Sequence, residues 1–236
     1  MKHPNISEEK KLWKKGYKCV VGLDEAGRGP LAGPVVAAAV CANFQFPISN
    51  FQSKPNFLIS KKVKDSKQLS AKKRKELYDI ITTYSNIEWG VGIVSEKVID
   101  RVNILEATKV AMKKAIRDAN IRMHTNNTNK KIDFILIDGN FKLDIDIPQK
   151  SIIRGDQKVF SISAASIIAK VTRDRIMQKY HRKYPEYGFI SHKGYPTKAH
   201  FTSLQKFGPC GIHRKTFNLK LSEPQRVYPA FTQRLF

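Results

Sequence analysis

Four carboxylates stand at the ends of apolar runs in the sequence. Asp24 and Glu25 follow Cys-Val-Val-Gly-Leu, Asp138 follows Phe-Ile-Leu-Ile, and Asp156 follows Ser-Ile-Ile-Arg-Gly. A carboxylate at the border of an apolar core costs free energy unless it is paired or bound to a cation, and neighbouring carboxylates repel one another. A divalent cation would remove both costs, so we take these four acids as candidate metal ligands and catalytic groups.

The donor chemistry indicates which ions and which reaction to expect. Mg²⁺ and Mn²⁺ prefer carboxylate and water ligands, and the sequence contains no His or Cys cluster with metal-ligand spacing. Two such ions about 3.5–4 Å apart can activate water and stabilise the leaving oxygen of a phosphodiester. The four acids therefore predict metal-dependent phosphodiester hydrolysis with Mn²⁺ or Mg²⁺ as the cofactor.

Each of these acids also has a purely structural interpretation. Asp24 with Glu25 could cap a turn, and Asp138-Gly and Gly155-Asp156 are common turn signals. Other acids are rivals for the site, with structural roles expected for them. Asp133 lies inside a strand and would point to its solvent edge, Asp144 and Asp146 lie in a loop, and Asp174 pairs with a neighbouring arginine on a helix.

The charge of the whole chain favours a polyanionic partner. The 236 residues include 43 Lys and Arg against 20 Asp and Glu, which gives a net charge of +23 and a pI near 10.0. Such an excess attracts nucleic acid, although a general lysine bias could account for part of it. A small acidic centre for metal within a basic surround for phosphates would explain both features.

Apolar periodicity predicts the elements that position the acids. Strands are expected over residues 17–23, 35–42, 87–94, 132–137 and 151–154. Helices are expected over 71–84 with Ser70 as N-cap, after Ser95 and after Asn103, and over 161–184 and 198–207. The order of these elements predicts an α/β fold with a mixed sheet and a small C-terminal helical extension.

Three regions are expected along the chain. Residues 1–16 form a basic, solvated or loosely helical leader, 17–186 the domain with the acids, and 187–236 a helical and turn-rich extension. Residues 43–64 form a long basic loop. The leader has no signal-peptide pattern, and no apolar run approaches the roughly 20 residues that span a membrane. We expect a cytoplasmic protein that does not enter membranes, with reduced thiols at Cys19, Cys41 and Cys210.

Seven ordered motifs carry a family resemblance. They are Gly22-Leu-Asp-Glu-Ala-Gly-Arg-Gly-Pro-Leu-Ala-Gly-Pro34, Asp65-Ser-Lys67, Ile137-Asp-Gly-Asn140, Gly155-Asp156, Ser163-Ala-Ala-Ser-Ile-Ile-Ala-Lys-Val-Thr-Arg-Asp174, His192-Lys-Gly-Tyr-Pro-Thr197 and Gly208-Pro-Cys-Gly-Ile-His-Arg214. Over residues 17–217, the sequence resembles bacterial ribonuclease HII. A lone Asp-Gly would mean little, but the ordered set is specific.

The resemblance implies a ribonuclease H-like fold, with a mixed five-stranded sheet flanked by helices. It implies an endoribonuclease that cleaves the RNA strand of RNA–DNA hybrids and nicks duplex DNA 5′ of single embedded ribonucleotides, leaving 5′-phosphate and 3′-hydroxyl ends. Asp24, Glu25, Asp138 and Asp156 correspond to the metal-binding catalytic acids. The first three are the firmer ligands in the family, and the fourth completes the site with substrate.

The resemblance also implies residues that bind the substrate. The loop Gly27-Arg28-Gly29 resembles the reader of the ribose 2′-hydroxyl, working with Tyr195. Glycine lets the backbone approach a sugar closely, and the 2′-hydroxyl is the group that separates RNA from DNA. Without the motif, Tyr195 would be an ordinary surface turn residue.

Further candidates for phosphate contacts are Lys67, Ser163, Lys170 and Arg173. Ser166, Lys170 and Arg173 fall at helical spacing and would share one face. The alternative is that Ser166 only packs and that Lys170 is a solvated charge. His200 and His213 are expected to be structural or solvent-facing.

Two rival functions remain open at this point. A non-catalytic nucleic-acid-binding protein would share the charge but would have no need of acids at strand ends. Another nuclease or resolvase of the same fold would lack the Gly-Arg-Gly loop with Tyr195, and the related ribonuclease HIII family also lacks that loop. We expect a monomer. The choice of Mn²⁺ or Mg²⁺, the role of residues 43–64 and any protein partner stay open.

Overall fold

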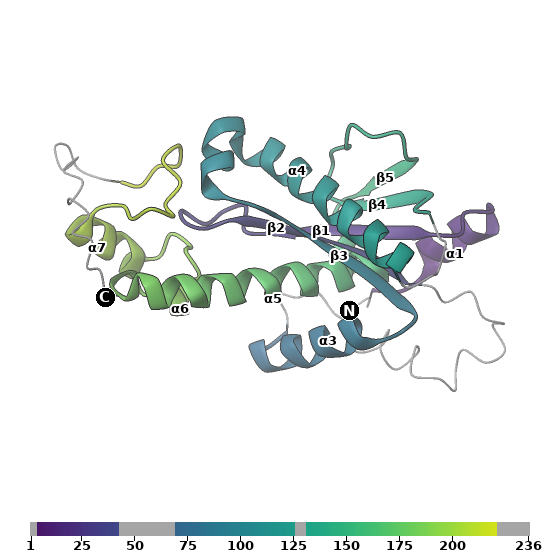
Figure 1. Cartoon of the computed structure of the whole chain (residues 1–236), viewed down its shortest axis with the longest axis horizontal. Coiled ribbons are helices and arrows are strands. Elements are labelled where there is room, and N and C mark those ends of the chain that lie inside the picture. Colours follow the sequence, from purple (N-terminus) through teal and green to yellow (C-terminus); the bar gives the residue numbers. More distant parts are fainter. Residues whose placement is uncertain (1–3, 43–68, 126–130, 221–236) are drawn as a thin grey trace.

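Five strands form one mixed sheet in the computed structural model, which describes residues 4–42, 69–125 and 131–220 (Figure 1). The strands are β1 Val20–Ala26, β2 Val35–Ala42, β3 Ile87–Val94, β4 Phe134–Asp138 and β5 Gln149–Ile152. Their order is β3-β2-β1-β4-β5, with β1–β2 and β2–β3 antiparallel and β1–β4 and β4–β5 parallel. The predicted mixed α/β sheet is confirmed.

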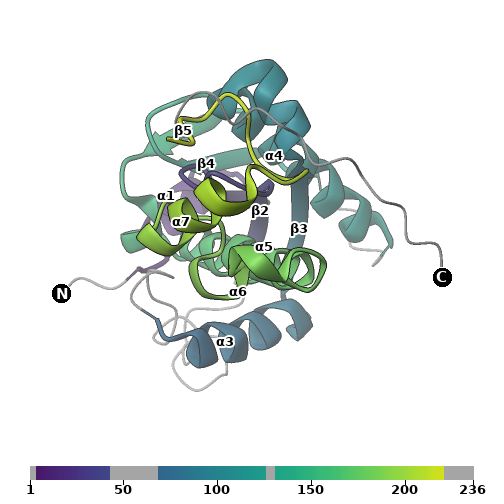
Figure 2. The ribbon, with the colours of Figure 1, turned by 90° about the vertical axis from the view of Figure 1, so that its left-hand side faces the viewer.

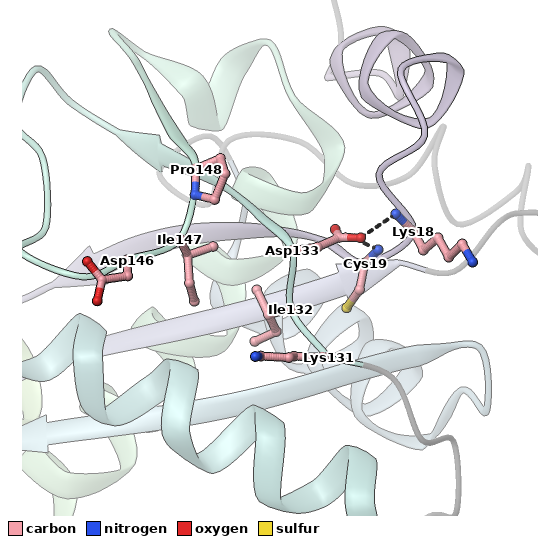
Figure 3. Close-up of a pocket in the computed structure, with 8 residues that line it drawn as sticks. All are labelled: Lys18, Cys19, Lys131, Ile132, Asp133, Asp146, Ile147 and Pro148. Atoms are coloured by element: carbon pink, nitrogen blue, oxygen red, sulfur yellow. Dashed lines mark hydrogen bonds between the residues drawn. The ribbon is translucent and has the colours of Figure 1, made fainter.

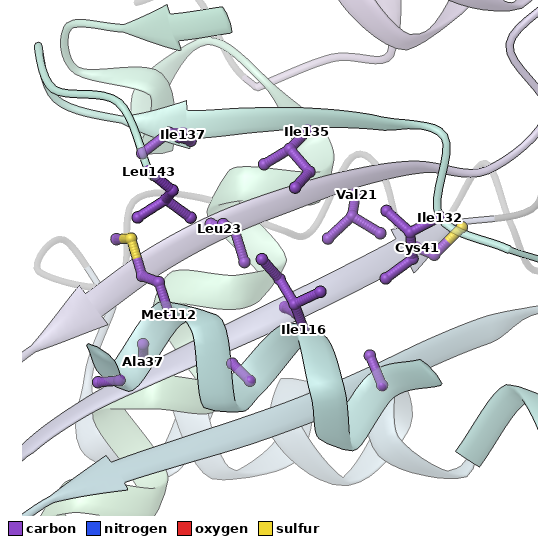
Figure 4. Close-up of a cluster of buried hydrophobic side chains, with 14 of the residues drawn as sticks. Val21, Leu23, Ala37, Cys41, Met112, Ile116, Ile132, Ile135, Ile137 and Leu143 are labelled. Atoms are coloured by element: carbon purple, nitrogen blue, oxygen red, sulfur yellow. The ribbon is translucent and has the colours of Figure 1, made fainter. Parts of the chain in front are cut away.

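One face of the sheet is covered by the long helix α4, Glu96–Thr125 (Figure 4). Successive side chains of a strand point to opposite faces, and the alternate residues Val35, Ala37, Ala39 and Cys41 of β2 all pack in this layer. Helix α4 lies very close to β3, because a Cβ added at Gly92 would stand 1.9 Å from the Ala111 carbonyl oxygen.

The other face is covered mainly by helix α5, Phe160–Lys183, with α3, Ala71–Thr83, packed beside it. Its first turn presses against β1, since a Cβ added at Gly22 would lie 2.3 Å from the carbonyl carbon of Ser161. Ala38 and Val40 of β2 pack on this side. The close approach places α5 directly above the end of β1 that carries the acids.

Two predicted helix starts are confirmed by side-chain caps. The Ser70 hydroxyl accepts a hydrogen bond from the Lys73 amide (3.3 Å) at the start of α3. Asn103 lies at a kink inside α4, with φ of 68°, and its Oδ1 accepts from the amides of Leu105 and Glu106. Asn103 thus ends one helical stretch and caps the next.

The leader contains a packed helix, α1, Ser7–Lys14. Leu12 is buried against Val20, Leu136 and Ile162. The Glu9 carboxylate is also buried and accepts hydrogen bonds from the Ser161 amide (2.9 Å) and hydroxyl (2.8 Å) at the start of α5. The helical part of the leader is therefore joined to the body of the protein rather than solvated.

The C-terminal extension lies at the end of the sheet toward which β1 points (Figures 1 and 2). It contains α6, Phe189–His192, and α7, Lys198–Phe207. A third apolar cluster joins it to α5 and to the β1–β2 loop through Leu31, Met177, Phe189, Leu204 and Ile212. The cysteines Cys19, Cys41 and Cys210 are free thiols. Among the described residues, no helix has the length and apolarity to cross a membrane.

Candidate active site

The sheet register brings Asp24 and Asp138 together. Strands β1 and β4 run parallel with Leu23 paired with Ile137, so the next residue of each strand is an aspartate at the same sheet edge. Leu23 and Ile137 both pack toward α4, and strand alternation turns the two aspartates to the α5 face. The sequence predicted that β1 ends before Asp24, which is wrong: the strand continues to Ala26 through pairing with β2.

Asp156 completes a cluster of three carboxylates. It lies in a single 3₁₀ turn, Gly155–Gln157, and the Gly155 amide donates to Asp138 Oδ1 at 2.7 Å. Carboxylate oxygens of Asp24, Asp138 and Asp156 lie within 4.8 Å of one another. Asp24 and Asp156 are only 5% and 3% exposed, so two of the three acids are almost removed from water.

The electrostatics of this cluster favour a bound cation. Burial raises the pKa of the Asp24 carboxyl well above its usual range, and the negative charges of Glu25, Asp138 and Asp156 raise it further. The hydrogen bond from the Glu25 amide to Asp24 Oδ1, at 2.7 Å, acts in the opposite direction. Three converging hard oxygen donors fit Mg²⁺ or Mn²⁺, which would relieve the repulsion.

Glu25 lies beside the cluster and is not one of its three members. It follows Asp24 in β1 and pairs in register with Ala37 of β2. Its Oε1 is 3.4 Å from Nη1 of Arg28. The structure thus brings three of the four predicted acids together and leaves the fourth beside Asp24, close enough for its charge to raise the Asp24 pKa.

Asp133, a rival acid, has a structural role at the opposite end of β1 (Figure 3). Its carboxylate accepts hydrogen bonds from the Lys18 amide (2.6 Å) and the Cys19 amide (3.0 Å). It lines a pocket of about 500 Å³ with Ile132 and Asp146 among others. This pocket borders the start of β1, away from the three clustered carboxylates.

The Gly27-Arg28-Gly29 loop and Tyr195 lie side by side. A Cβ added at Gly29 would stand 3.8 Å from Cε1 of the Tyr195 ring. Arg28 and Gly29 are exposed, and Tyr195 is 41% exposed. Nζ of Lys170 is 6.0 Å from the centre of the Tyr195 ring. The predicted sugar-reading residues and one predicted phosphate contact therefore share one surface, just beyond the acids in β1.

Other predicted substrate contacts are placed differently. Ser163 is fully buried because the first turns of α5 pack on the sheet, and its hydroxyl finds no hydrogen-bond partner among the described residues. Arg173 is 1% exposed and faces the protein interior. Neither side chain is open to a phosphate in this structure. Lys67 lies outside the described residues, as does the 43–64 segment.

The structure corrects the expected partner of Asp174 and decides between the two alternatives for the histidines. Asp174 pairs with Lys170 (2.8 Å), one helical turn away, and not with an arginine as predicted. His200 and His213 are both buried, with their Nε2 atoms 3.0 Å apart, so the solvent-facing alternative is wrong and the structural one is confirmed. Lys170 keeps 22% of its side chain exposed, which leaves it accessible beside Tyr195.

Arg214 is the residue that sequence reasoning passed over. It closes the last recognised motif, but its type alone suggested a surface charge. In the structure it is fully buried and donates to main-chain carbonyls of the β1–β2 loop. Its place at the end of a matched motif was the one available signal that it matters.

The fold and the carboxylate cluster define a nuclease of the ribonuclease H class. The structure of ribonuclease H2 from Pyrococcus horikoshii is similar, with a TM-score of 0.61 and 28% identity over 85% of this chain and 94% of that one. Bst-RNase HIII in complex with Mn²⁺ shares the fold at 19% identity, with a TM-score of 0.58 over 85% of this chain and 67% of that one.

Sequence comparison narrows the class to one family. Residues 21–220 match the family model of ribonuclease HII. Ribonuclease HII of Syntrophus aciditrophicus is 46% identical over 219 residues, covering 93% of each chain. The chain therefore belongs to the ribonuclease HII family, and it is a metal-dependent endoribonuclease that acts on RNA–DNA hybrids. The predicted preference for this family over ribonuclease HIII is confirmed.

Proposed function

We propose that the protein, besides cleaving hybrids, nicks duplex DNA on the 5′ side of a single embedded ribonucleotide by two-metal hydrolysis. The observation that carries the catalytic part is the convergence of the Asp24, Asp138 and Asp156 carboxylates within 4.8 Å. Glu25 is included as a ligand because its charge acts directly on Asp24. The products are a 3′-hydroxyl and a 5′-phosphate end.

The acids act as the holders of the divalent ions. When bound, such ions supply an activated water and stabilise the leaving 3′ oxygen. Asp24 and Asp138 are fixed by parallel strand pairing, and the Gly155 amide orients the Asp138 carboxylate. Because these supports are main-chain bonds, the donor oxygens are held in place before substrate arrives.

Selection of a ribonucleotide is assigned to the loop and the tyrosine that lie above the acids. The exposed Arg28 and Gly29 offer backbone groups that can approach a 2′-hydroxyl, and the adjacent Tyr195 ring can stack on the sugar or base. Lys170, which is close to the same ring and is paired with Asp174, is the proposed contact for a flanking phosphate. Deoxyribose lacks the hydroxyl that these groups would bind.

The cofactor is Mn²⁺ or Mg²⁺. The oxygen donor set suits both ions, and Bst-RNase HIII, a protein of the same fold, was solved with Mn²⁺. We further propose that the protein acts on nucleic acid as a cytoplasmic monomer. In that assignment residues 17–186 are the catalytic domain, and residues 187–236 supply the Tyr195 motif.

Cleavage of three matched duplexes tests this proposal. They are a continuous RNA–DNA hybrid, a DNA duplex with one ribonucleotide, and the same DNA duplex without it. We expect cuts in the first two, with the nick in the second mapped to the 5′ side of the ribonucleotide and ending in a 3′-hydroxyl. A hybrid-only activity, or a nick on the 3′ side, would contradict the proposed selectivity.

A further inference from the structure

Three separate chain segments meet beneath the surface formed by Gly29 and Tyr195. They are the β1–β2 loop (residues 27–34), the turn that carries Tyr195 (192–197) and residues 210–214. We propose that Arg173, Arg214 and the His200–His213 pair are positioning residues that hold the loop and the turn in one fixed arrangement for ribonucleotide selection. This inference rests on the proposed function of that surface. These four side chains are called the recognition frame below.

Arg214 holds both ends of the β1–β2 loop. Its Nη2 donates to the Gly27 carbonyl at 2.6 Å, Nη1 to the Arg28 carbonyl at 2.9 Å, and Nε to the Gly33 carbonyl at 3.0 Å. A planar guanidinium has five N–H donors in a rigid fork, which suits several carbonyls at fixed angles. The conformation of the exposed Arg28 backbone is therefore set from below by one buried side chain.

Arg173 joins the loop to the tyrosine turn. Its Nε donates to Pro34 O (3.0 Å) and its Nη2 to Ala32 O (3.1 Å), both in the loop. Its Nη1 donates to Lys193 O (3.0 Å), two residues before Tyr195. The side chain is 1% exposed, so these bonds are shielded from water. Arg173 thus fixes the distance between the two recognition elements.

The histidine pair reaches the tyrosine from the other side. The Cys210 amide donates to Nδ1 of His213 (2.9 Å), and the two Nε2 atoms of His213 and His200 are 3.0 Å apart. Nδ1 of His200 is 2.9 Å from the Tyr195 carbonyl oxygen. One assignment satisfies all three contacts, in which His213 donates through Nε2 and His200 donates through Nδ1. This chain of bonds ends on the Tyr195 backbone.

Main-chain bonds close the same assembly. The Leu31 amide donates to Gly194 O, the Gly33 amide to Ile212 O, and the Arg214 amide to Leu31 O, each at 2.8 Å. Backbone bonds of this kind already hold the segments together. The four frame side chains add directional contacts at the Gly27 and Arg28 carbonyls and at the Tyr195 carbonyl.

Two buried guanidiniums are a costly way to hold a loop. Burial disfavours a charge, and within the described part of the chain Arg173 and Arg214 donate their hydrogen bonds to neutral carbonyls. Asp100 and Glu96 offset part of the cost at Arg214. Positive charge beneath a surface that receives phosphates is less costly once the polyanion is bound. We infer that this cost is retained because the geometry above it selects the substrate.

The test is a double-mutant cycle between Arg173→Lys and Tyr195→Ala. A lysine keeps the charge but carries its donors on a single nitrogen, so it does not reproduce the fork in which three nitrogens of Arg173 each bond one carbonyl. We expect kcat/KM for the single-ribonucleotide duplex to fall about 10- to 100-fold, and to fall less for the continuous hybrid. Because Arg173 would act through Tyr195, the double variant should be little worse than Tyr195→Ala alone. Arg182→Lys, at an exposed position of α5, is the matched control.

Several outcomes separate this inference from the proposed function. If the wild type does not cut at a single ribonucleotide, the proposed function and the inference both fail. Two results with an active wild type would show that the frame is merely structural. Arg173→Lys could lower activity on both substrates equally, or its loss of kcat/KM could add fully to the loss caused by Tyr195→Ala. Should Arg173→Lys not fold, His213→Gln, which keeps a side-chain donor toward His200, carries the same expectation. Mn²⁺ affinity should be unchanged in either variant.

Discussion

At the scale of single residues, the folded protein disfavours the ionised form of the Asp24 carboxyl. This carboxyl is buried beside three other acids, and both effects raise its pKa in the folded protein without metal. The folded state then holds a proton more tightly than the unfolded chain. Ionised Asp24 therefore destabilises the metal-free protein near neutral pH, and that penalty shrinks as the pH falls toward the raised pKa.

Asp24→Asn should therefore stabilise the metal-free protein while removing the response to metal. Without ions we expect a higher melting temperature, with each kcal/mol worth about 2–4 °C for a chain of this length. With Mn²⁺ the wild type should gain stability and the variant should gain little. Thermal melts with chelator and with Mn²⁺ measure both effects. A variant that melts lower in chelator yet keeps the full Mn²⁺ response would refute the role of Asp24.

Tyr195 provides the residue-scale test of selectivity. Tyr195→Ala removes a ring that is 41% exposed next to Gly29 and Lys170, so its loss should alter recognition more than folding. We expect cleavage at a single ribonucleotide to fall about tenfold more than cleavage of a continuous hybrid. Tyr195→Phe keeps the ring and separates stacking from the hydroxyl. Equal losses on both substrates would remove Tyr195 from recognition.

The sheet edge that carries the acids was predictable from the sequence, but the tertiary contacts around the site were not. Apolar runs ending in Asp24 and Asp138 indicated the right sheet edge. The continuation of β1 through Glu25 to Ala26 depends on pairing with β2. Similarly, helical spacing predicted that Arg173 shares a face of α5 with Lys170, but the burial of Arg173 is created by the distant β1–β2 loop.

At the scale of elements, helix starts were the easiest features to predict, because caps are local. Ser70 and Asn103 bond to amides within three residues, as their positions indicated. The packing of α1 was not predictable, because its contacts with Leu136 and Ser161 come from more than 100 residues away. The buried histidine pair depends in the same way on the meeting of two segments.

That histidine pair makes a prediction about pH. Burial lowers the pKa of His200 to about 4 and that of His213 to about 3. The neighbouring His192 lowers both pKa values further, and His200 also lowers that of His213. The backbone contacts of His200 with Tyr195 and of His213 with Cys210 act in the opposite direction. Because the folded pKa values lie below the unfolded value of about 6.5, stability is present above that pH and is lost as the pH falls below it.

Unfolding by denaturant at pH 7.5 and at pH 5 measures this effect. The wild type should lose on the order of 2–4 kcal/mol over that interval, from two histidines that each resist protonation. His213→Gln should be less stable at pH 7.5 but should show a flatter pH dependence. An identical pH dependence in the two proteins would show that the pair is not the source of the loss.

At the scale of the whole molecule, an acidic centre is embedded in a chain with a net charge of +23. The charge predicted a polyanionic partner, and the family assignment bears out nucleic acid as the substrate. The three-segment assembly under Tyr195 could not be predicted from the sequence, because tertiary contacts join its residues 27–34, 192–197 and 210–214.

The same charge predicts strongly salt-dependent binding. With the Asp138→Asn variant, used so that the substrate stays intact, hybrid affinity should fall at least about 40-fold between 50 and 200 mM NaCl if three or more phosphates are neutralised. Lys170→Ala should reduce the slope of log affinity against log salt by roughly one phosphate contact. A nearly salt-independent affinity would mean that the basic surface does not hold the phosphates.

The most direct measurement compares cleavage and binding by the wild type and Asp138→Asn, on a duplex DNA with one ribonucleotide, in Mg²⁺, in Mn²⁺ and in chelator. The clustered carboxylates predict a 5′-side nick by the wild type with metal and none with chelator. They also predict no nick by Asp138→Asn in either ion, with hybrid binding largely intact. Cleavage retained in Asp138→Asn, or cleavage by the wild type in chelator, would contradict the assignment of these acids as the metal-binding catalytic centre.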